Sequence, residues 1–441
     1  MKFFKLALTL LLILSNSIAF AVSLKQVFND ALNNDPQYKA AIAENQALIK
    51  NKSIALSLVL PNLNLGANIT NNAQSTTIQN IESKSDFDSN GYSLSLTQTI
   101  YNHDSFTQLS QANQTVAIAN ANFLGVRQEL ILRVASSYYN VLAGIDNLDF
   151  AVAEKKAIEQ QLHQVKQRFD VGLTAITDVH ENQARYDLSV AAEIEAVNFL
   201  DINKEKLREI TGILYSSFKS LKENTPLLNP EPLNIDDWIK TAIDNNIALF
   251  VSSKNMKISK QEISRAQSGH YPTLDLVAST NRSDTTRSFD GTNYIGIEQN
   301  STSLALQLNL ALYQGGRTSS KSKQAQYQYQ QSRQLYEKQR RQTERETRTS
   351  YLTVISNISR VKAFKQALIS SEIALKATQA GFEVGTRTAV EVLNSQRELY
   401  KAERDYAKSR YAYILETLRL RLAAGTLIDT DINMINTWLV N

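Results

Sequence analysis

Alternating side-chain character marks four stretches of the chain, with large apolar residues at every second position, and predicts β-strands there. The clearest run places leucine at every second position from Leu304 to Leu312. We expect the strands at about residues 60–72, 90–101, 271–283 and 299–313. Two segments rich in Ser, Thr, Asn and Asp, residues 71–90 and 281–300, are expected to form the polar loop within each pair of strands.

Strands of about ten residues with one apolar face and a polar loop are typical of outer-membrane β-barrels. Tyr101, Tyr271 and Tyr313 lie at expected strand ends, where such barrels carry an aromatic girdle. The alternative is a soluble β-sandwich, which shows the same alternation. A sandwich is disfavoured because long helical sequence separates the two pairs of strands.

The apolar residues between the strands follow a seven-residue repeat instead. From about Asp104 to Arg168 the chain has no proline, and the repeat predicts one helix that packs as a left-handed coiled coil. Sixty-five helical residues would extend about 100 Å. The positions that carry the repeat are Leu124, Ile131, Tyr138, Ile145 and Val152 in the first half, and Val354, Val361, Leu368, Leu375 and Phe382 in the second.

The two halves of the chain are copies of each other. Residues 167–186 align without a gap on residues 380–399, so that Phe169 matches Phe382 and Gly172 matches Gly385. We therefore expect a tandem-repeat protomer with repeats at residues 22–220 and 234–427, an inter-repeat linker at 221–233 and a C-terminal segment at 428–441. Each repeat would consist of a helix, two strands, a very long helix, a Val-Gly turn and a returning helix.

The first 21 residues have the pattern of a secretory signal peptide. Lys2 and Lys5 precede an apolar run, and Ala19-Phe20-Ala21 has small residues at the spacing of a cleavage site. The alternative, a membrane anchor, is weaker because the run is too short to span a bilayer. The mature protein, expected to begin at Val22, would then be exported.

The composition argues against an enzyme or a cofactor protein. The chain contains no cysteine, and its four histidines are scattered without metal-ligand spacing. Lys and Arg number 47 against 43 Asp and Glu, a dispersed net charge of +4 that does not indicate nucleic acid. We expect no catalytic residue, no cofactor, no metal and no nucleic-acid partner.

Four strands cannot close a barrel, and an open sheet edge is not tolerated in lipid. Copies of the chain must therefore associate. Two copies would give eight strands with a filled interior, whereas three would give twelve strands and a lumen. This geometry describes an exit duct that is mainly α with a membrane β-barrel. The alternative function is a soluble periplasmic coiled-coil scaffold or adaptor.

The motifs of the chain resemble those of the TolC-like outer-membrane efflux proteins, from Leu24 to about Leu439. The landmarks are LPNLNLGA at 60–67, RFDVGLTAITDV at 168–179, GHYPTLDLVAST at 269–280, YQGG at 313–316, VGTRTAVEVL at 384–393 and AAGTL at 423–427. The resemblance implies a homotrimer with a 12-stranded outer-membrane β-barrel, continued by a long periplasmic α-helical barrel of coiled coils. The implied partners are outer-membrane lipid, a periplasmic adaptor (membrane fusion) protein and an inner-membrane pump of RND, ABC or MFS type. The implied cargo is drugs and other small molecules, or proteins exported by type I secretion.

The same resemblance locates a periplasmic gate. The family's acidic ring maps to Glu391 and Asn394, and the second of these is an amide rather than an acid. The family's polar bonds between hairpins map to Asp178, Arg387 and a tyrosine that is Phe382 here. Independently, Thr388-x-x-Glu391 has the spacing of a capping box, so Glu391 is expected to cap a helix, to line the pore, or to do both.

The resemblance also places adaptor docking at the two Val-Gly turns. Gly172 and Gly385 are expected to reverse the chain in a left-handed conformation. Small residues there would also let a partner helix approach closely, although the turn alone could explain them. The expected docking residues are Val171, Gly172, Leu173, Thr174, Val384, Gly385 and Thr386.

Overall fold

A computed structural model describes residues 21–288 and 294–440. The expected signal peptide, except Ala21, lies outside the described residues. The helices are α2 (Leu24–Asn34), α3 (Pro36–Ser57), α4 (His103–Asp170), α5 (Ile176–Thr211), α6 (Ile235–Asn245), α7 (Ile247–Gln267), α8 (Arg317–Glu383), α9 (Ala389–Ala423), α10 (Asp429–Asn436) and the short 3₁₀ helix η1 (Ser268–His270). The strands are β1 (Asn62–Ile78), β2 (Ile81–Tyr101), β3 (Thr273–Ser288) and β4 (Tyr294–Asn309).

The chain divides into two compact units, each assembled from segments far apart in sequence. Of the described residues, the first unit holds 21–42, 123–249 and 340–440, and the second holds 43–122, 250–288 and 294–339. Helices α4 and α8 contribute to both units, and the long helices expected from the seven-residue repeat are confirmed: α4 has 68 residues and α8 has 67. Among the described residues, no helix is both long and apolar enough to cross a membrane.

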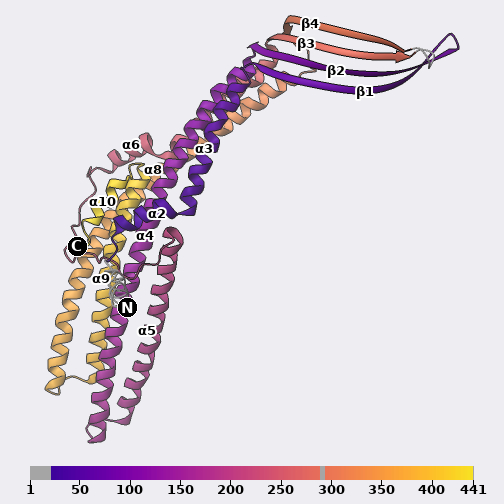
Figure 1. Ribbon diagram of the computed structural model, residues 1–441. Coiled ribbons are helices and arrows are strands. Elements are labelled where there is room, and N and C mark those ends of the chain that lie inside the picture. The colour runs from indigo at the N-terminus through magenta and orange to yellow at the C-terminus, as the bar shows by residue number, and fades with distance from the viewer. Residues whose placement is uncertain (1–20, 289–293, 441) are drawn as a thin grey trace, which may run out of the picture. The chain divides into compact units, whose positions relative to one another are not determined.

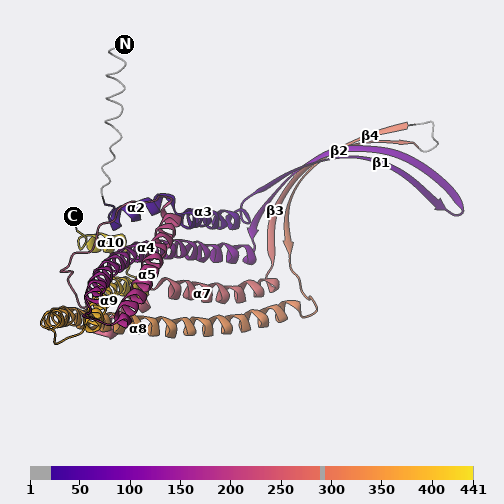
Figure 2. The same ribbon diagram turned by 90° about the horizontal axis from the view of Figure 1, so that it is seen from below.

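The strands of the second unit form one antiparallel sheet in the order β1-β2-β3-β4. Figure 2 shows the four strands side by side, with β1 and β4 at the two edges. The expected alternation places the apolar side chains of the four strands on one face of the sheet, and those of Leu63, Leu65, Leu304 and Leu306 are exposed. A single sheet contradicts the β-sandwich alternative, and among the described residues it leaves two edges without a partner strand.

The expected polar loop at residues 71–90 is wrong. Strands β1 and β2 stay paired from Asn62 opposite Thr97 to Ile78 opposite Ile81, and only Gln79 and Asn80 form the turn. Both turn residues have positive φ, 51° and 66°, as a two-residue hairpin turn that follows the strand twist requires. Cross-strand bonds hold the polar stretch as strand, since Asn71 Nδ2 donates to Asp88 Oδ1 at 2.6 Å.

The second expected loop and the last expected strand also need correction. Strand β3 continues to Ser288, and β4 starts at Tyr294, so most of residues 281–300 are strand. Strand β4 ends at Asn309 rather than 313, although alternation continues to Leu312. The reason lies in its neighbour: β3 begins at Thr273, directly after Pro272, which has no N–H to extend the ladder.

Helical segments of the second unit lie next to one another in the order α3, α4, α7, α8 (Figure 2). Polar contacts join each neighbouring pair. Asn45 on α3 bonds Asn120 on α4, Gln111 on α4 bonds Glu262 on α7, and Ser259 on α7 lies 2.8 Å from Ser332 on α8. These contacts give the layer of helices a fixed order at the foot of the sheet.

The core of the first unit gathers where short helices pack on the long ones. Leu24, Phe28 and Ala31 of α2 are buried against it, and α10 adds Ile432 and Ile435. The hydroxyl of Tyr138, on α4, donates to the carbonyl oxygens of Val22 at 3.0 Å and Lys219 at 2.8 Å. The core therefore holds the segment that begins at Val22, the segment after α5 and the C-terminal segment together.

Burial along the seven-residue repeat is uneven. Ile131, Tyr138, Val354 and Val361 are buried in the core, as the repeat predicts. Leu124 and Val152 belong to the same repeat, yet they are exposed. The buried positions of the repeat belong to the core of the first unit, whereas Leu124 and Val152 are not covered within the single chain.

Candidate functional site at the hairpin tips

The two helical hairpins of the first unit, α4–α5 and α8–α9, run side by side and turn at the same end (Figure 1). Both turns have the same hydrogen bonds: Leu173 N–H donates to Arg168 O, and Thr386 N–H donates to Gly381 O, each at 2.8 Å. Gly172 has φ +76° and Gly385 has φ +81°, as this helix termination requires. A Cβ at either glycine would meet no atom within 4 Å, so the backbone conformation explains glycine here without any crowding inside the chain.

The capping box expected at the start of α9 is present. Thr388 Oγ1 accepts from the N–H of Glu391, and Glu391 Oε2 accepts from the N–H of Thr388 at 2.7 Å. These bonds lower the pKa of Glu391 below its ordinary 4.5: the N–H of Thr388 contributes most, followed by the Arg387 guanidinium and the Thr388 hydroxyl. The side chain is partly exposed and negatively charged at neutral pH.

Asp178 and Arg387 do not contact each other in the chain. Asp178, in the first turn of α5, accepts a short hydrogen bond from the Thr174 hydroxyl. Arg387 Nη1 lies 2.8 Å from Glu391 Oε1. Among the described residues no bond joins the Asp178 carboxylate to Arg387, so the expected pairing between the hairpins is not made within one chain.

Two arginines of the first hairpin instead touch the second hairpin within one chain. The guanidinium carbon of Arg168, on α4, lies 4.3 Å from the centre of the Phe382 ring on α8. Arg185 Nη1, on α5, donates to Asn394 Oδ1 on α9 at 3.2 Å. Phe382 and Asn394 are the two positions where this chain lacks a tyrosine hydroxyl and a second acid. Each of them contacts an arginine of the first hairpin.

Reasoning from sequence missed Arg168 and Arg185 as site residues. Arg168 stands in the motif RFDVG, but its partner lies 214 positions further along the chain. One signal was available: a phenylalanine in place of a tyrosine keeps an aromatic face, and arginine packs well on such a face. No sequence pattern pointed to Arg185, because its contact depends on how the two hairpins pack.

Behind the tips, a groove of about 720 Å³ lies between α4, α8 and α9. Its walls are rich in amide side chains, and the side-chain nitrogen Nε2 of Gln161 is buried with no hydrogen-bond partner among the described residues. At the turns themselves three apolar side chains are exposed: Val171 at 68 %, Leu173 at 75 % and Val384 at 76 %. Within the described ranges, no group of three or more His, Cys, Asp or Glu side chains could hold a metal.

Comparison with known proteins settles which family has these hairpins. The sequence model of the family described as Outer membrane efflux protein matches residues 27–213 and again residues 238–426. The chain belongs to this family. The double match agrees with the tandem repeat read from the sequence, and membership in the family places the chain in the outer membrane. The alternative of a soluble periplasmic scaffold or adaptor is therefore wrong, and the chain is an outer-membrane exit duct.

Individual relatives agree over almost the whole chain. Outer membrane protein TolC of Escherichia coli is 36 % identical over 431 residues, which cover 96 % of this chain and 86 % of that protein. Alkaline protease secretion protein AprF of Pseudomonas aeruginosa is 27 % identical over 430 residues, covering 96 % and 89 %. The solved CmeC outer membrane channel of Campylobacter jejuni has the same fold, with a TM-score of 0.76, 13 % identity and coverage of 95 % and 90 %.

Proposed function

We propose that three copies of the chain form one duct, in which their sheets join edge to edge into a 12-stranded barrel. The sheet of the second unit carries this proposal. Strands β1 and β4 each have one neighbour in the sheet, so each offers a free row of backbone N–H and C=O groups. Lipid cannot satisfy those groups, whereas pairing β1 of one copy with β4 of the next removes every edge.

The exposed leucines of β1 and β4 support the same assembly. In a closed barrel one face of the sheet contacts lipid and the other lines the lumen. Leu304, Leu306 and Leu308 form an exposed row along β4 that would be stable against lipid and is costly in water. Three copies leave a lumen, whereas two would give a barrel filled by side chains.

The helical hairpins are proposed to continue the duct into the periplasm and to close it at the tips. Around a threefold axis, Glu391 would present three carboxylates and Asn394 three amides. We infer that Asp178 of one copy meets Arg387 of its neighbour, while Arg168 and Arg185 tie the two hairpins of each copy. Opening then requires the second hairpin to swing away from the first.

The apolar turns are proposed to receive a periplasmic adaptor, which links the duct to an inner-membrane pump of RND, ABC or MFS type. Val171, Leu173 and Val384 supply exposed apolar contacts, and Gly172 and Gly385 leave open space beside them. The pump supplies the energy, so the duct itself catalyses no reaction. Cargo would be drugs and other small molecules, proteins exported by type I secretion, or both. The family description, Outer membrane efflux protein, supports efflux, and the name of the relative AprF, alkaline protease secretion protein, supports protein export.

Engineered cysteines test the closure directly, because the natural chain has none. One cysteine replaces Gly66 on β1, and a second is moved one residue at a time along β4 from Ser303 to Leu308. After oxidation in intact cells, we expect covalent products up to three chains and no further. The matched control has the β1 cysteine alone. Products of a single chain at every position, or a ladder that extends past three chains, would contradict the proposal.

A further inference from the structure

A polar cavity of about 630 Å³ opens in the second unit, on the helical side of the sheet. Its walls come from the first turn of α4, the C-terminal part of α7 with η1, and the first three turns of α8. Its charged lining consists of Asp104, Glu262, Arg265, Arg317 and Lys321. The gate and the adaptor surface lie in the first unit, so this cavity is not part of either.

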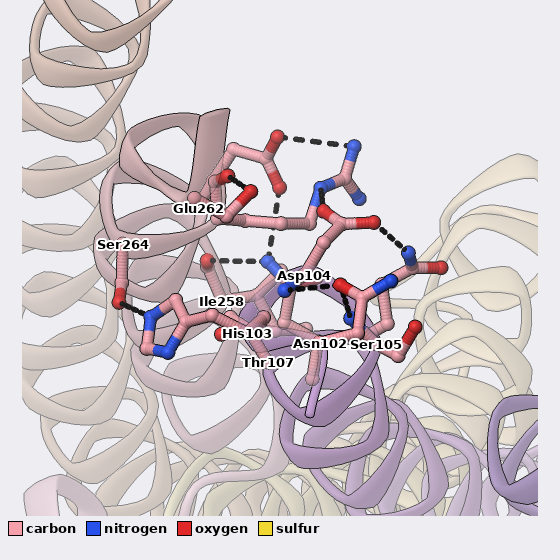
Figure 3. Close-up of polar contacts among 12 residues, drawn as sticks. Asn102, His103, Asp104, Ser105, Thr107, Ile258, Glu262 and Ser264 are labelled. Atoms are coloured by element: carbon pink, nitrogen blue, oxygen red, sulfur yellow. Dashed lines mark hydrogen bonds and ion pairs between the residues drawn. The ribbon is translucent and has the colours of Figure 1, made fainter. Parts of the chain in front are cut away.

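One wall of the cavity is a fixed network, shown in Figure 3. Arg265 lies 3.4 Å from Asp104 and 3.2 Å from Glu262, so both carboxylates have a cationic partner. Gln111 Nε2 also donates to Glu262 at 3.0 Å, and Asn102 caps α4 by accepting from the N–H of Asp104 at 3.1 Å. The acidic groups of the cavity are therefore already paired and held in place.

The opposite wall of the cavity carries two cationic side chains that belong to no such network. Arg317 and Lys321 are one helical turn apart on α8, so both face the same side of that helix. Within the part of the chain that the structure describes, neither side chain has an ion pair or a hydrogen bond. The cavity thus has two unpaired cationic groups, which favour a ligand that brings a negative charge.

The position of the cavity indicates where that ligand comes from. The apolar row on β4 ends at Leu308, and the cavity lining begins six residues later at Gln314. Aromatic side chains lie at the same level: Tyr101 contacts Phe106 at 6.4 Å between ring centres, and Tyr271 contacts His103 at 5.0 Å. Apolar rows that end in aromatic residues mark the boundary between hydrocarbon and headgroups.

We propose that this cavity binds the phosphate-bearing headgroup of an anionic phospholipid, in the leaflet on the helical side of the membrane. Arg317 and Lys321 hold the phosphate, since both residue types bind phosphate oxygens strongly. Arg265, held by Asp104 and Glu262, forms part of the facing wall of the cavity. The proposal rests on the proposed function, because it needs the sheet to lie in a bilayer. Basic pockets at a membrane surface bind lipid headgroups in the same way.

The test is native mass spectrometry of the full-length protein, purified from membranes in detergent and titrated with phosphatidylglycerol. The double substitution R317Q/K321Q removes both unpaired cations. The matched control is K323Q/R333Q, which removes the same charge from two positions of α8 that are exposed, as Arg317 and Lys321 are, but do not line the cavity. The conservative exchange R317K/K321R keeps both charges. Diacylglycerol and glycerol 3-phosphate serve as probes that lack the phosphate and the acyl chains respectively.

We expect R317Q/K321Q to weaken phosphatidylglycerol binding by roughly tenfold or more, from the loss of two cations at a membrane surface. The control and the conservative exchange should stay within about twofold of the natural protein. Equal loss in R317Q/K321Q and K323Q/R333Q, or equal binding of diacylglycerol, would overturn the proposal. Glycerol 3-phosphate binding as tightly as the lipid would reassign the cavity to soluble phosphate compounds. The same spectra count chains, so a failure of the proposed trimer is seen separately from a failure of lipid binding.

Discussion

Replacing Phe382 by leucine should loosen the closed duct. The substitution keeps an apolar side chain but removes the aromatic face on which the Arg168 guanidinium lies, 4.3 Å from the ring centre. That contact joins the first hairpin to the second within one chain. If the second hairpin must swing away for the duct to open, the contact is present in the closed state and absent in the open one.

The size of the effect follows from the surroundings of the pair. Arg168 is exposed and Phe382 is half-buried, so the contact stabilises the closed state by about 0.5–1 kcal/mol in each copy. Three copies that open together would lose about 1.5–3 kcal/mol. Since about 1.4 kcal/mol corresponds to a factor of ten, the ratio of open to closed ducts should rise by roughly 10- to 150-fold.

The assay is single-channel recording of the purified protein in planar bilayers, scored as the fraction of time spent above the closed conductance. The control is Phe169→Leu, because Phe169 occupies the matching position of the first repeat, where the described residues supply no cation against its ring. Arg168→Gln should open the duct as much as Phe382→Leu, and the double variant should open it no further. Additive effects, or a Phe382→Leu duct that stays as closed as the natural one, would refute the role of this contact.

Three further expectations concern the charged groups at the tips. Asp178→Ala and Arg387→Ser should each raise the closed-state conductance if these residues pair between copies; a duct unchanged by both is closed by other contacts. Block by a trivalent cation from the periplasmic side should need the Glu391 carboxylate, whose lowered pKa keeps it charged to lower pH than an ordinary glutamate. Block should therefore persist on mild acidification, fade on stronger acidification and vanish in Glu391→Gln. Asn394→Asp should strengthen that block. The increase should be larger in combination with Arg185→Gln, because Arg185 Nη1 lies 3.2 Å from Asn394 Oδ1 and its guanidinium would neutralise the new acid. Equal block with and without Arg185 would show that this arginine does not face the ion.

Sequence patterns predicted the architecture where local and tertiary preferences agree. Leu304, Leu306 and Leu308 alternate and lie on a strand, and Ile131 and Tyr138 follow the seven-residue repeat and are buried. Gly172 and Gly385 correctly predicted both hairpin turns, because a left-handed backbone conformation at a helix end is strongly favoured by glycine.

Patterns failed where a neighbour decides the structure. Residues 71–78 are polar and resemble a loop, but they continue β1 because Asn71 and Ser75 bond Asp88 and Glu82 across the hairpin. Alternation also continues past Asn309, whereas strand pairing stops because the partner strand is preceded by proline. Alternation describes one strand, and the length of a strand depends on its partner.

At the candidate site, too, local contacts could be predicted from the sequence and contacts between hairpins could not. The capping role of Glu391 could be predicted, since Thr388 lies three residues away on the same helix start. The contacts of Arg168 and Arg185 could not, because their partners belong to the other hairpin. Contacts between copies, such as that expected for Asp178, depend on the assembly and have no signature within one chain.

The shared trimeric duct is tested most directly by an electron cryo-microscopy structure of the full-length protein in a lipid bilayer disc. We expect three copies around one axis and a closed barrel of twelve strands, with β1 of each copy paired to β4 of the next. The hairpin tips of all three copies should converge on that axis, with Glu391 facing it. A particle of one or two copies, or a barrel in which β1 and β4 remain unpaired, would contradict the shared duct.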